Sequence, residues 1–372
     1  GICTATTVNT TNLVNATPLS NRNIAINGAM QVAQRATSVT SITSSGYRTA
    51  DRWGLSVTGT GTWTNTISTD TPDGFASSYK MDCTTADTSL GASDLLIFYQ
   101  PIEGQNLQSF AKGTSSAKEF TASFYIKTNK TGTYVVELYD ADNSRQVSQS
   151  YTVSDTNWNR YTVTFPADTT GAFGNDNGAS LYLQWWLAAG TTYTSGTLNT
   201  SWATPVSANR VSALNVNLAD STSNEWLITG VQLEVGSVAT PFEHRSFGDE
   251  LVRCQRYFQT ISRSSNANSV NGTFAAGTCN NNGGNGGILQ VMVRFQTTMR
   301  AVPTMTQSGT FSHHVSGVNV ADTTVAFDQA YIDGVKCTGT QTAFVSADGS
   351  CGELTSKYSD TSTAIINASA EL

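Results

Sequence analysis

Charged side chains are scarce in this chain. Asp, Glu, Lys and Arg make up 13% of its 372 residues, about half of the roughly 25% that is usual in soluble domains. Thr, Ser, Asn and Gly fill the polar positions instead, a composition typical of extracellular β-structures and particle coats and unusual in cytosolic metabolic enzymes. The formal net charge is −7 and no run of Lys or Arg occurs. We therefore predict no nucleic-acid partner.

Long hydrophobic runs are missing as well. No stretch of 18 apolar residues exists, and the first residues, Gly1 to Thr4, form neither a basic region nor an apolar core. The sequence therefore predicts no membrane insertion and no intact signal peptide. A start at Gly1 leaves open whether this residue is the native N-terminus.

Catalytic motifs are absent too. No GxSxG, HExxH, P-loop or GxGxxG pattern occurs, and the histidines are His244, His313 and His314. His244 is expected to hydrogen-bond at the junction between two domains. His313 and His314 would face opposite sides of a strand, so the two could not bind one metal ion together. An alternative is a metal site on a threefold axis, to which each of three subunits contributes one histidine. We predict that the protein is not an enzyme, with no catalytic residues, no cofactor and no metal.

Carboxylates need separate consideration, because glycoside cleavage uses a pair of them. Several lie near predicted turns, where Asp accepts hydrogen bonds from its own backbone and needs no catalytic role: Asp140, Asp142, Asp155, Asp168 and Asp176. The segment 168–177, DTTGAFGNDN, could alternatively supply oxygen ligands to a calcium ion, although its spacing does not match the usual calcium loop.

Six cysteines occur, without any CxxC spacing, so zinc is not supported. Cys337 and Cys351 flank a predicted hairpin at 343–349 and are the best candidates for a disulfide bond. Free thiols packed as small apolar groups are the favoured alternative if the protein is assembled in a bacterial cytoplasm.

Short runs of β-branched and aromatic residues, separated by Gly, Asn and Asp, predict an all-β protein. The predicted strands include 120–127 and 132–140, paired as a hairpin, and then 146–153, 160–165, 181–187 and 226–234. The fold class that we predict is a jelly-roll β-sandwich followed by a second, smaller β-rich domain. The domains are an extended N-terminal arm at 1–20, the sandwich at 21–247 and a distal β-rich domain at 248–372. The glycine-rich stretch 280–287 is predicted to be a loop.

Tryptophans are the candidates for stacking on sugar rings, through the apolar C–H faces of the sugar. They are Trp53, Trp63, Trp158, Trp185 and Trp202. A sandwich core also takes most of its tryptophans, so each could equally be a packing residue. Trp185 and Trp186 are adjacent on one strand, so one of the two must point inward and the other outward.

Several blocks of this sequence resemble bacteriophage tail-fibre and virion-appendage proteins, especially those of marine podoviruses. The blocks are 21–35 (NRNIAINGAMQVAQR), 47–53 (YRTADRW), 124–127 (FYIK), 151–153 (YTV), 187–190 (LAAG), 230–243 (GVQLEVGSVATPFE), 254–258 (CQRYF), 293–295 (VRF), 299–304 (MRAVPT) and 370–372 (AEL). Together, these blocks extend over most of residues 21–372. The resemblance implies a carbohydrate-binding-module-like jelly roll with a distal β-domain. The N-terminal arm departs from the family pattern.

From this resemblance we expect a structural virion protein of a tailed bacteriophage, a tail fibre or a head or capsid appendage, that mediates attachment to host surface glycans. The resemblance also implies a homotrimer, contact with other virion proteins through the N-terminal arm, assembly in the bacterial host cytoplasm and exposure on the particle surface. Two alternatives stay open: a capsid-decoration protein without a receptor role, and a secreted carbohydrate-binding module or polysaccharide depolymerase.

Overall fold

The structure is a computed structural model that describes residues 21–264, 273–281, 287–315, 318–340, 351–356 and 363–372. The chain divides into two compact units, one that ends at Glu250 and one from Leu251 to Glu371. The sequence placed this boundary after residue 247. The predicted arm at 1–20 and the predicted hairpin at 343–349 lie outside the described residues.

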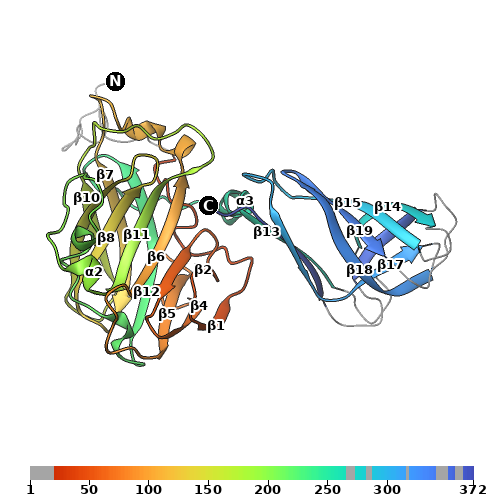
Figure 1. Ribbon diagram of the computed structural model, residues 1–372, viewed down its shortest axis with the longest axis horizontal. Coiled ribbons are helices and arrows are strands. Elements are labelled where there is room, and N and C mark those ends of the chain that lie inside the picture. The colour runs from red at the N-terminus through yellow and green to blue at the C-terminus, as the bar shows by residue number, and fades with distance from the viewer. Residues whose placement is uncertain (1–20, 265–272, 282–286, 316–317, 341–350, 357–362) are drawn as a thin grey trace, which may run out of the picture. The chain divides into compact units, whose positions relative to one another are not determined.

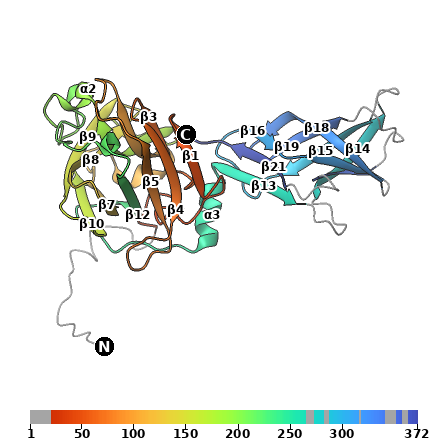
Figure 2. The same ribbon diagram turned by 90° about the horizontal axis from the view of Figure 1, so that it is seen from below.

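The first unit consists of two six-stranded antiparallel sheets that form two layers (Figures 1 and 2). Sheet I has the order β1 (Ser38–Ile42), β4 (Thr62–Ser68), β5 (Ser78–Thr85), β12 (Glu225–Val235), β7 (Phe120–Thr128) and β10 (Asn159–Phe165). Sheet II has the order β2 (Gly46–Tyr47), β3 (Gly54–Thr58), β6 (Leu95–Glu103), β11 (Ala179–Ala189), β8 (Gly132–Asp140) and β9 (Arg145–Val153). The predicted jelly-roll sandwich is therefore confirmed.

Short helices lie in the connections of this unit. They are η1 (Gly104–Asn106), η2 (Gln108–Phe110), α2 (Thr191–Thr194), η3 (Ser207–Asn209) and η4 (Leu218–Asp220). A longer helix, α3 (Phe247–Gln255), follows the sandwich. None of the helices in the described ranges is long and apolar enough to span a membrane.

The core of the sandwich follows from the two-residue period of its strands. Phe98 of β6 stacks on Trp53, with ring centroids 4.8 Å apart, and meets Trp226 of sheet I at 5.5 Å. Trp185 of β11 lies 5.2 Å from Phe124 of sheet I. Because these side chains fill the space between the sheets, their neighbours in sequence point to the outer faces.

One predicted strand pairing is wrong. We expected 120–127 and 132–140 to form a hairpin, but β7 pairs with β10 and β12 in sheet I, whereas β8 pairs with β9 and β11 in sheet II. The connection crosses between the sheets because Asn129 holds it against the start of β12. The Asn129 side chain donates to the Ser223 carbonyl and accepts from the Glu225 amide, both at 2.9 Å.

The strand at 226–234 was expected to be half-buried, yet every residue of β12 after Glu225 is buried. It is a central strand between β5 and β7, and its outer face is covered by the segment that follows it. There, Thr240 donates through its amide and its hydroxyl to the Glu234 carboxylate at 2.9 and 2.7 Å.

The second unit contains a three-stranded sheet and a closed six-stranded barrel. The sheet has the order β13 (Phe258–Ser264), β21 (Thr363–Ser369) and β16 (Thr304–Ser308). The barrel has the order β14 (Thr273–Asn281), β15 (Gly287–Arg294), β19 (Gly334–Thr340), β18 (Val318–Tyr331), β17 (Phe311–Val315) and β20 (Cys351–Ser356). The predicted loop at 280–287 is shorter than expected, since Asn280 and Asn281 pair with Ile288 and Gly287.

The described cysteines carry free thiols. Cys83, Cys254, Cys279 and Cys337 are buried and Cys351 is exposed. Cys337 lies on β19 and Cys351 on β20, two barrel strands that do not pair with each other. Burial raises the pKa of Cys337 to about 12, so this thiol stays protonated at neutral pH.

Candidate functional site

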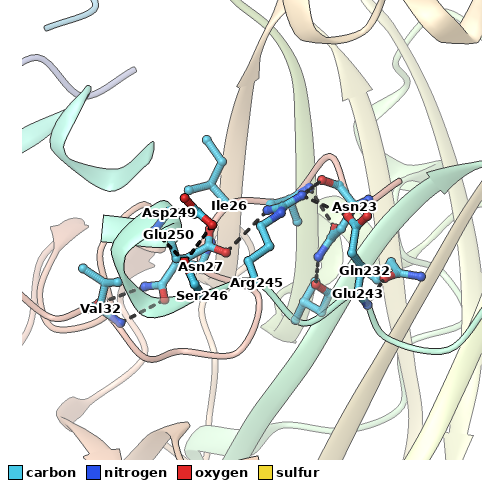
Figure 3. Close-up of polar contacts among 12 residues, drawn as sticks. Asn23, Ile26, Asn27, Val32, Gln232, Glu243, Arg245, Ser246, Asp249 and Glu250 are labelled. Atoms are coloured by element: carbon cyan, nitrogen blue, oxygen red, sulfur yellow. Dashed lines mark hydrogen bonds and ion pairs between the residues drawn. The ribbon is translucent and has the colours of Figure 1, made fainter. Parts of the chain in front are cut away.

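The block at 21–35, which carries part of the family resemblance, has a structural role in the first unit (Figure 3). Arg245 donates to the carbonyls of Asn23 and Ala25 and forms ion pairs with Glu243 at 3.4 Å and Glu250 at 3.5 Å. Glu243 in turn accepts the Asn23 amide at 3.0 Å. This network fixes the start of the sandwich to the segment that leaves it.

Asn27 extends the same network. Its amide donates to Glu250 at 2.6 Å, and its side chain bonds the Val32 backbone at 2.8 and 3.0 Å. Ser246 accepts the Asp249 amide and donates to the Asp249 carboxylate, which caps the first turn of α3. The hydrogen bonds of this network link segments of the chain to one another, so they explain the folding of this segment.

His244 does not take the expected role, since Arg245 forms the hydrogen bonds of this junction. The His244 ring is exposed and lies 5.2 Å from the Phe75 ring and 4.9 Å from the Phe242 ring. Its contacts are therefore with aromatic rings on the outer side of sheet I.

The outer face of sheet II presents a different arrangement. Strand register places Tyr99 of β6 opposite Gly54 of β3 on one side and Gln184 of β11 on the other, and Gln184 lies opposite Glu137 of β8. These side chains share one face, because their sequence neighbours Phe98 and Trp185 point into the core. One row of four residues thus crosses four strands.

A strip of tyrosine rings runs across the same face. The centroid of Tyr99 lies 6.2 Å from that of Tyr47 on β2 and 6.2 Å from that of Tyr182 on β11. Tyr182 lies 6.3 Å from Tyr139 on β8. All four rings are half-buried. Burial and the neighbouring Tyr139 raise the pKa of Tyr182, so its hydroxyl stays neutral.

Gly54 makes room for one ring of this strip. A Cβ atom at this position would lie 2.6 Å from Cζ of Tyr99. The missing side chain on β3 therefore leaves room for the Tyr99 ring beside this strand.

Arg210, which directly follows η3, covers the middle of the face. Its Nε and Nη2 donate to the two carboxylate oxygens of Glu137, both at 2.8 Å, and Trp186 Nε1 donates to the same carboxylate at 2.8 Å. The guanidinium also lies 4.8 Å from the centroid of the Trp186 ring. Burial alone would lower the pKa of Arg210, but the charge of Glu137 raises it, so the guanidinium remains charged.

A pocket with a volume of about 260 Å³ opens between these groups. The residues that line it are Ser56, Leu95, Ile97, Tyr99, Tyr182, Gln184 and Arg210. It combines two aromatic rings, an aliphatic wall and polar side chains, which is the usual composition of a small-ligand site.

None of the five tryptophans that the sequence singled out lies on this face. Trp53, Trp63 and Trp185 have no exposed surface and Trp202 has 9%, because the sandwich core takes them. A ring inside the core has no free face for a sugar. Trp158 is half-buried in the connection from β9 to β10 and donates from Nε1 to Asp70 at 2.8 Å. As predicted, Trp185 and Trp186 point in opposite directions, but Arg210 and Tyr193 cover Trp186.

The segment 168–177 binds the side-chain ammonium group of Lys112. The Lys112 ammonium lies 2.6 Å from Asp140 Oδ2 and 3.0 Å from Asp168 Oδ2, and it donates to the carbonyls of Thr170 at 3.0 Å and Gly171 at 2.7 Å. Burial alone would raise the pKa of Asp168, but hydrogen bonds from Arg145 and Lys112 hold it below the ordinary value. In the described residues, no group of three His, Cys, Asp or Glu side chains is placed to hold a metal ion.

The other predicted turn carboxylates bond nearby backbone. Asp155 accepts the Asn157 amide and Asp176 accepts the Gly178 amide, both at 2.8 Å. Asp142 accepts the Gly174 amide at 2.8 Å. The turn interpretation is confirmed for Asp155 and Asp176, whereas Asp142 bonds a residue 32 positions later in the sequence.

Comparisons with known proteins give only distant similarities. No family model matches the sequence, and no curated protein matches it. Among solved structures, the chain is similar to a family 11 carbohydrate-binding module from Clostridium thermocellum in complex with a β-1,3-1,4-mixed-linked tetrasaccharide, at 11% identity, covering 56% of this chain and 98% of that one, with a TM-score of 0.26. It is also similar to a Stig cyclase from Fischerella sp. TAU, at 12% identity, covering 59% and 99%, with a TM-score of 0.28.

A third similar structure contains the CBM22-1 and GH10 modules of endo-1,4-β-D-xylanase 10B from Clostridium thermocellum, complexed with xylohexaose. The identity is 11%, the match covers 58% of this chain and 29% of that one, and the TM-score is 0.29. At such identities and TM-scores, these similarities say nothing about what this chain binds.

Proposed function

We propose that the protein binds glycans on the outer face of sheet II. The observation that carries this proposal is the tyrosine strip next to a pocket with hydrogen-bonding side chains. Half-buried tyrosine rings offer flat apolar surfaces to the C–H faces of sugars. Arg210 and Gln184 supply further polar groups at the edge of the strip.

The strip also fits a chain of sugars better than one isolated ring. Its rings lie on four strands at steps of 6.2 to 6.3 Å, so successive sugar units could each meet an aromatic surface. Each contact of this kind is weak, and several together give a useful affinity.

A glycan-array screen followed by calorimetry of the best ligand tests this proposal. We expect Tyr182→Ala and Tyr99→Ala each to lower the affinity about tenfold, which corresponds to about 1.4 kcal/mol. Trp158→Ala is the matched aromatic control on the other side of the sandwich and should leave the affinity unchanged. A loss of binding with Trp158→Ala alone would place the glycan site elsewhere.

We further propose that this glycan-binding protein is a homotrimeric appendage on the virion of a tailed phage. The sequence resemblance supports this part of the proposal. Light scattering should then give a mass three times the 39.5 kDa of the chain. Labelled protein should bind host cells and be displaced by the intact phage. A clean monomer, or cell binding that the phage does not displace, would favour a secreted carbohydrate-binding module.

A further inference from the structure

Arg210 and Gln184 bring hydrogen-bond donors to the pocket. Arg210 uses Nε and Nη2 for Glu137, and Nη2 also approaches Gln184 Oε1 at 3.5 Å. Within the described part of the chain, Arg210 Nη1 and Gln184 Nε2 donate to no residue. The N–H groups on these two nitrogens are therefore available to a ligand in the pocket that both side chains line.

No carboxylate is among the residues that line the pocket. The nearest carboxylate in the network, Glu137, has no exposed surface, and its oxygens are already bonded by Arg210 and Trp186. Because Glu137 also cancels the charge of Arg210, the pocket carries no net charge from this pair. A ligand group that fits should thus be a neutral acceptor, since a carboxylate would lose its hydration without meeting a net positive charge.

An apolar wall faces these donors. Leu95 and Ile97 of β6 line the pocket together with the rings of Tyr99 and Tyr182. A plain hydroxyl group would leave this wall uncovered, whereas a methyl group would bury apolar surface against it. The pocket therefore suits a group with a carbonyl oxygen on one side and a methyl group on the other.

We propose that this pocket takes the acetamido group of an N-acetylated amino sugar. The carbonyl oxygen accepts from Arg210 and Gln184, the methyl group packs on Leu95 and Ile97, and the sugar ring lies on the tyrosine strip. The volume of about 260 Å³ is below the roughly 300–1,000 Å³ of pockets for drug-sized ligands, so it holds one sugar unit or substituent. This inference rests on the proposed glycan binding and names the sugar class.

Three trisaccharides with the same β-1,4 backbone test the inference. Triacetylchitotriose, cellotriose and the deacetylated glucosamine trimer differ only in the group at carbon 2. By calorimetry with the full chain, we expect triacetylchitotriose to bind at least tenfold more tightly than the other two. In saturation-transfer NMR, its acetyl methyl protons should give the strongest signal. Equal binding of cellotriose, or a weak methyl signal, would overturn the inference.

A variant separates the two proposals. Gln184→Leu keeps the size of the side chain but removes a donor, and it should lower the affinity for triacetylchitotriose toward that for cellotriose. If no acetylated sugar binds while another glycan binds in a Tyr182-dependent way, the acetamido pocket is wrong and glycan binding stands. If no glycan binds, both proposals fail.

N-acetylated amino sugars occur in cell-wall peptidoglycan and in surface polysaccharides. Co-sedimentation with purified peptidoglycan and retention on immobilised lipopolysaccharide distinguish these sources. Binding to either source that triacetylchitotriose displaces supports the inference, and binding that it does not displace contradicts it.

Discussion

Replacing Lys112 by methionine is expected to lower the free energy of unfolding of the first unit by about 3–5 kcal/mol. The Lys112 and Asp140 side chains have no exposed surface and pair at 2.6 Å. Without the ammonium, the Asp140 carboxylate and the carbonyls of Thr170 and Gly171 lose a buried partner. Urea unfolding followed by tryptophan fluorescence measures this effect, because all seven tryptophans lie before residue 250.

Lys127→Met is the matched control for this change. Lys127 also pairs with an aspartate at 2.6 Å, but the Lys127 and Asp70 side chains are 30% and 43% exposed. An exposed pair contributes about 0–1 kcal/mol, so this variant should change the stability little. Adding Asp140→Asn to Lys112→Met should recover part of the loss. If both lysine variants lowered the free energy of unfolding equally, the buried Lys112 ammonium would contribute no more to stability than the exposed Lys127 ammonium does.

Replacing Arg210 by methionine should have the second large effect, and it should act on stability and on glycan binding together. The change leaves Glu137 buried with Trp186 Nε1 as its main remaining donor, at a cost of about 3–5 kcal/mol. It also removes the donor edge of the pocket. Unfolding by urea and calorimetry with the best glycan measure the two effects separately.

Glu137→Gln added to Arg210→Met distinguishes the two roles of this arginine. A neutral amide at 137 removes the unpaired charge, so stability should largely return while glycan affinity stays low. Arg160→Met, which changes an exposed arginine that donates to Ser123 on sheet I at 3.0 Å, should alter neither quantity. Full recovery of glycan affinity in the double variant would exclude Arg210 from the binding site.

The sequence predicted the fold class because strand alternation is a local signal. Runs such as 181–187 identify strands, but they left open whether Trp185 or Trp186 faces the core. Strand partners are a different matter. The short connection at 128–131 looked like a hairpin turn, yet Asn129 ties it to β12, which lies about a hundred residues later in the sequence. Such long-range contacts leave no local pattern.

The proposed binding face was missed for the same reason. Side chains alternate along a strand, so Tyr99 points away from the side of Phe98, and Tyr182 points away from the side of Trp185. Each tyrosine could therefore have been assigned to an outer face. Their convergence with Gln184 depends on the register of β6 and β11, and Arg210 comes from a connection without strand pattern. The sequence analysis chose tryptophans as the candidates for sugar stacking. In a sandwich, these large side chains mostly fill the core.

The central claim is that glycans bind on the outer face of sheet II, and a crystal structure of the protein with its best array ligand tests it most directly. The account predicts sugar density over the Tyr99 and Tyr182 rings, with one substituent inside the pocket beside Arg210. Sugar density at the Phe75 and Phe242 rings outside sheet I, with none over the tyrosine strip, would contradict it.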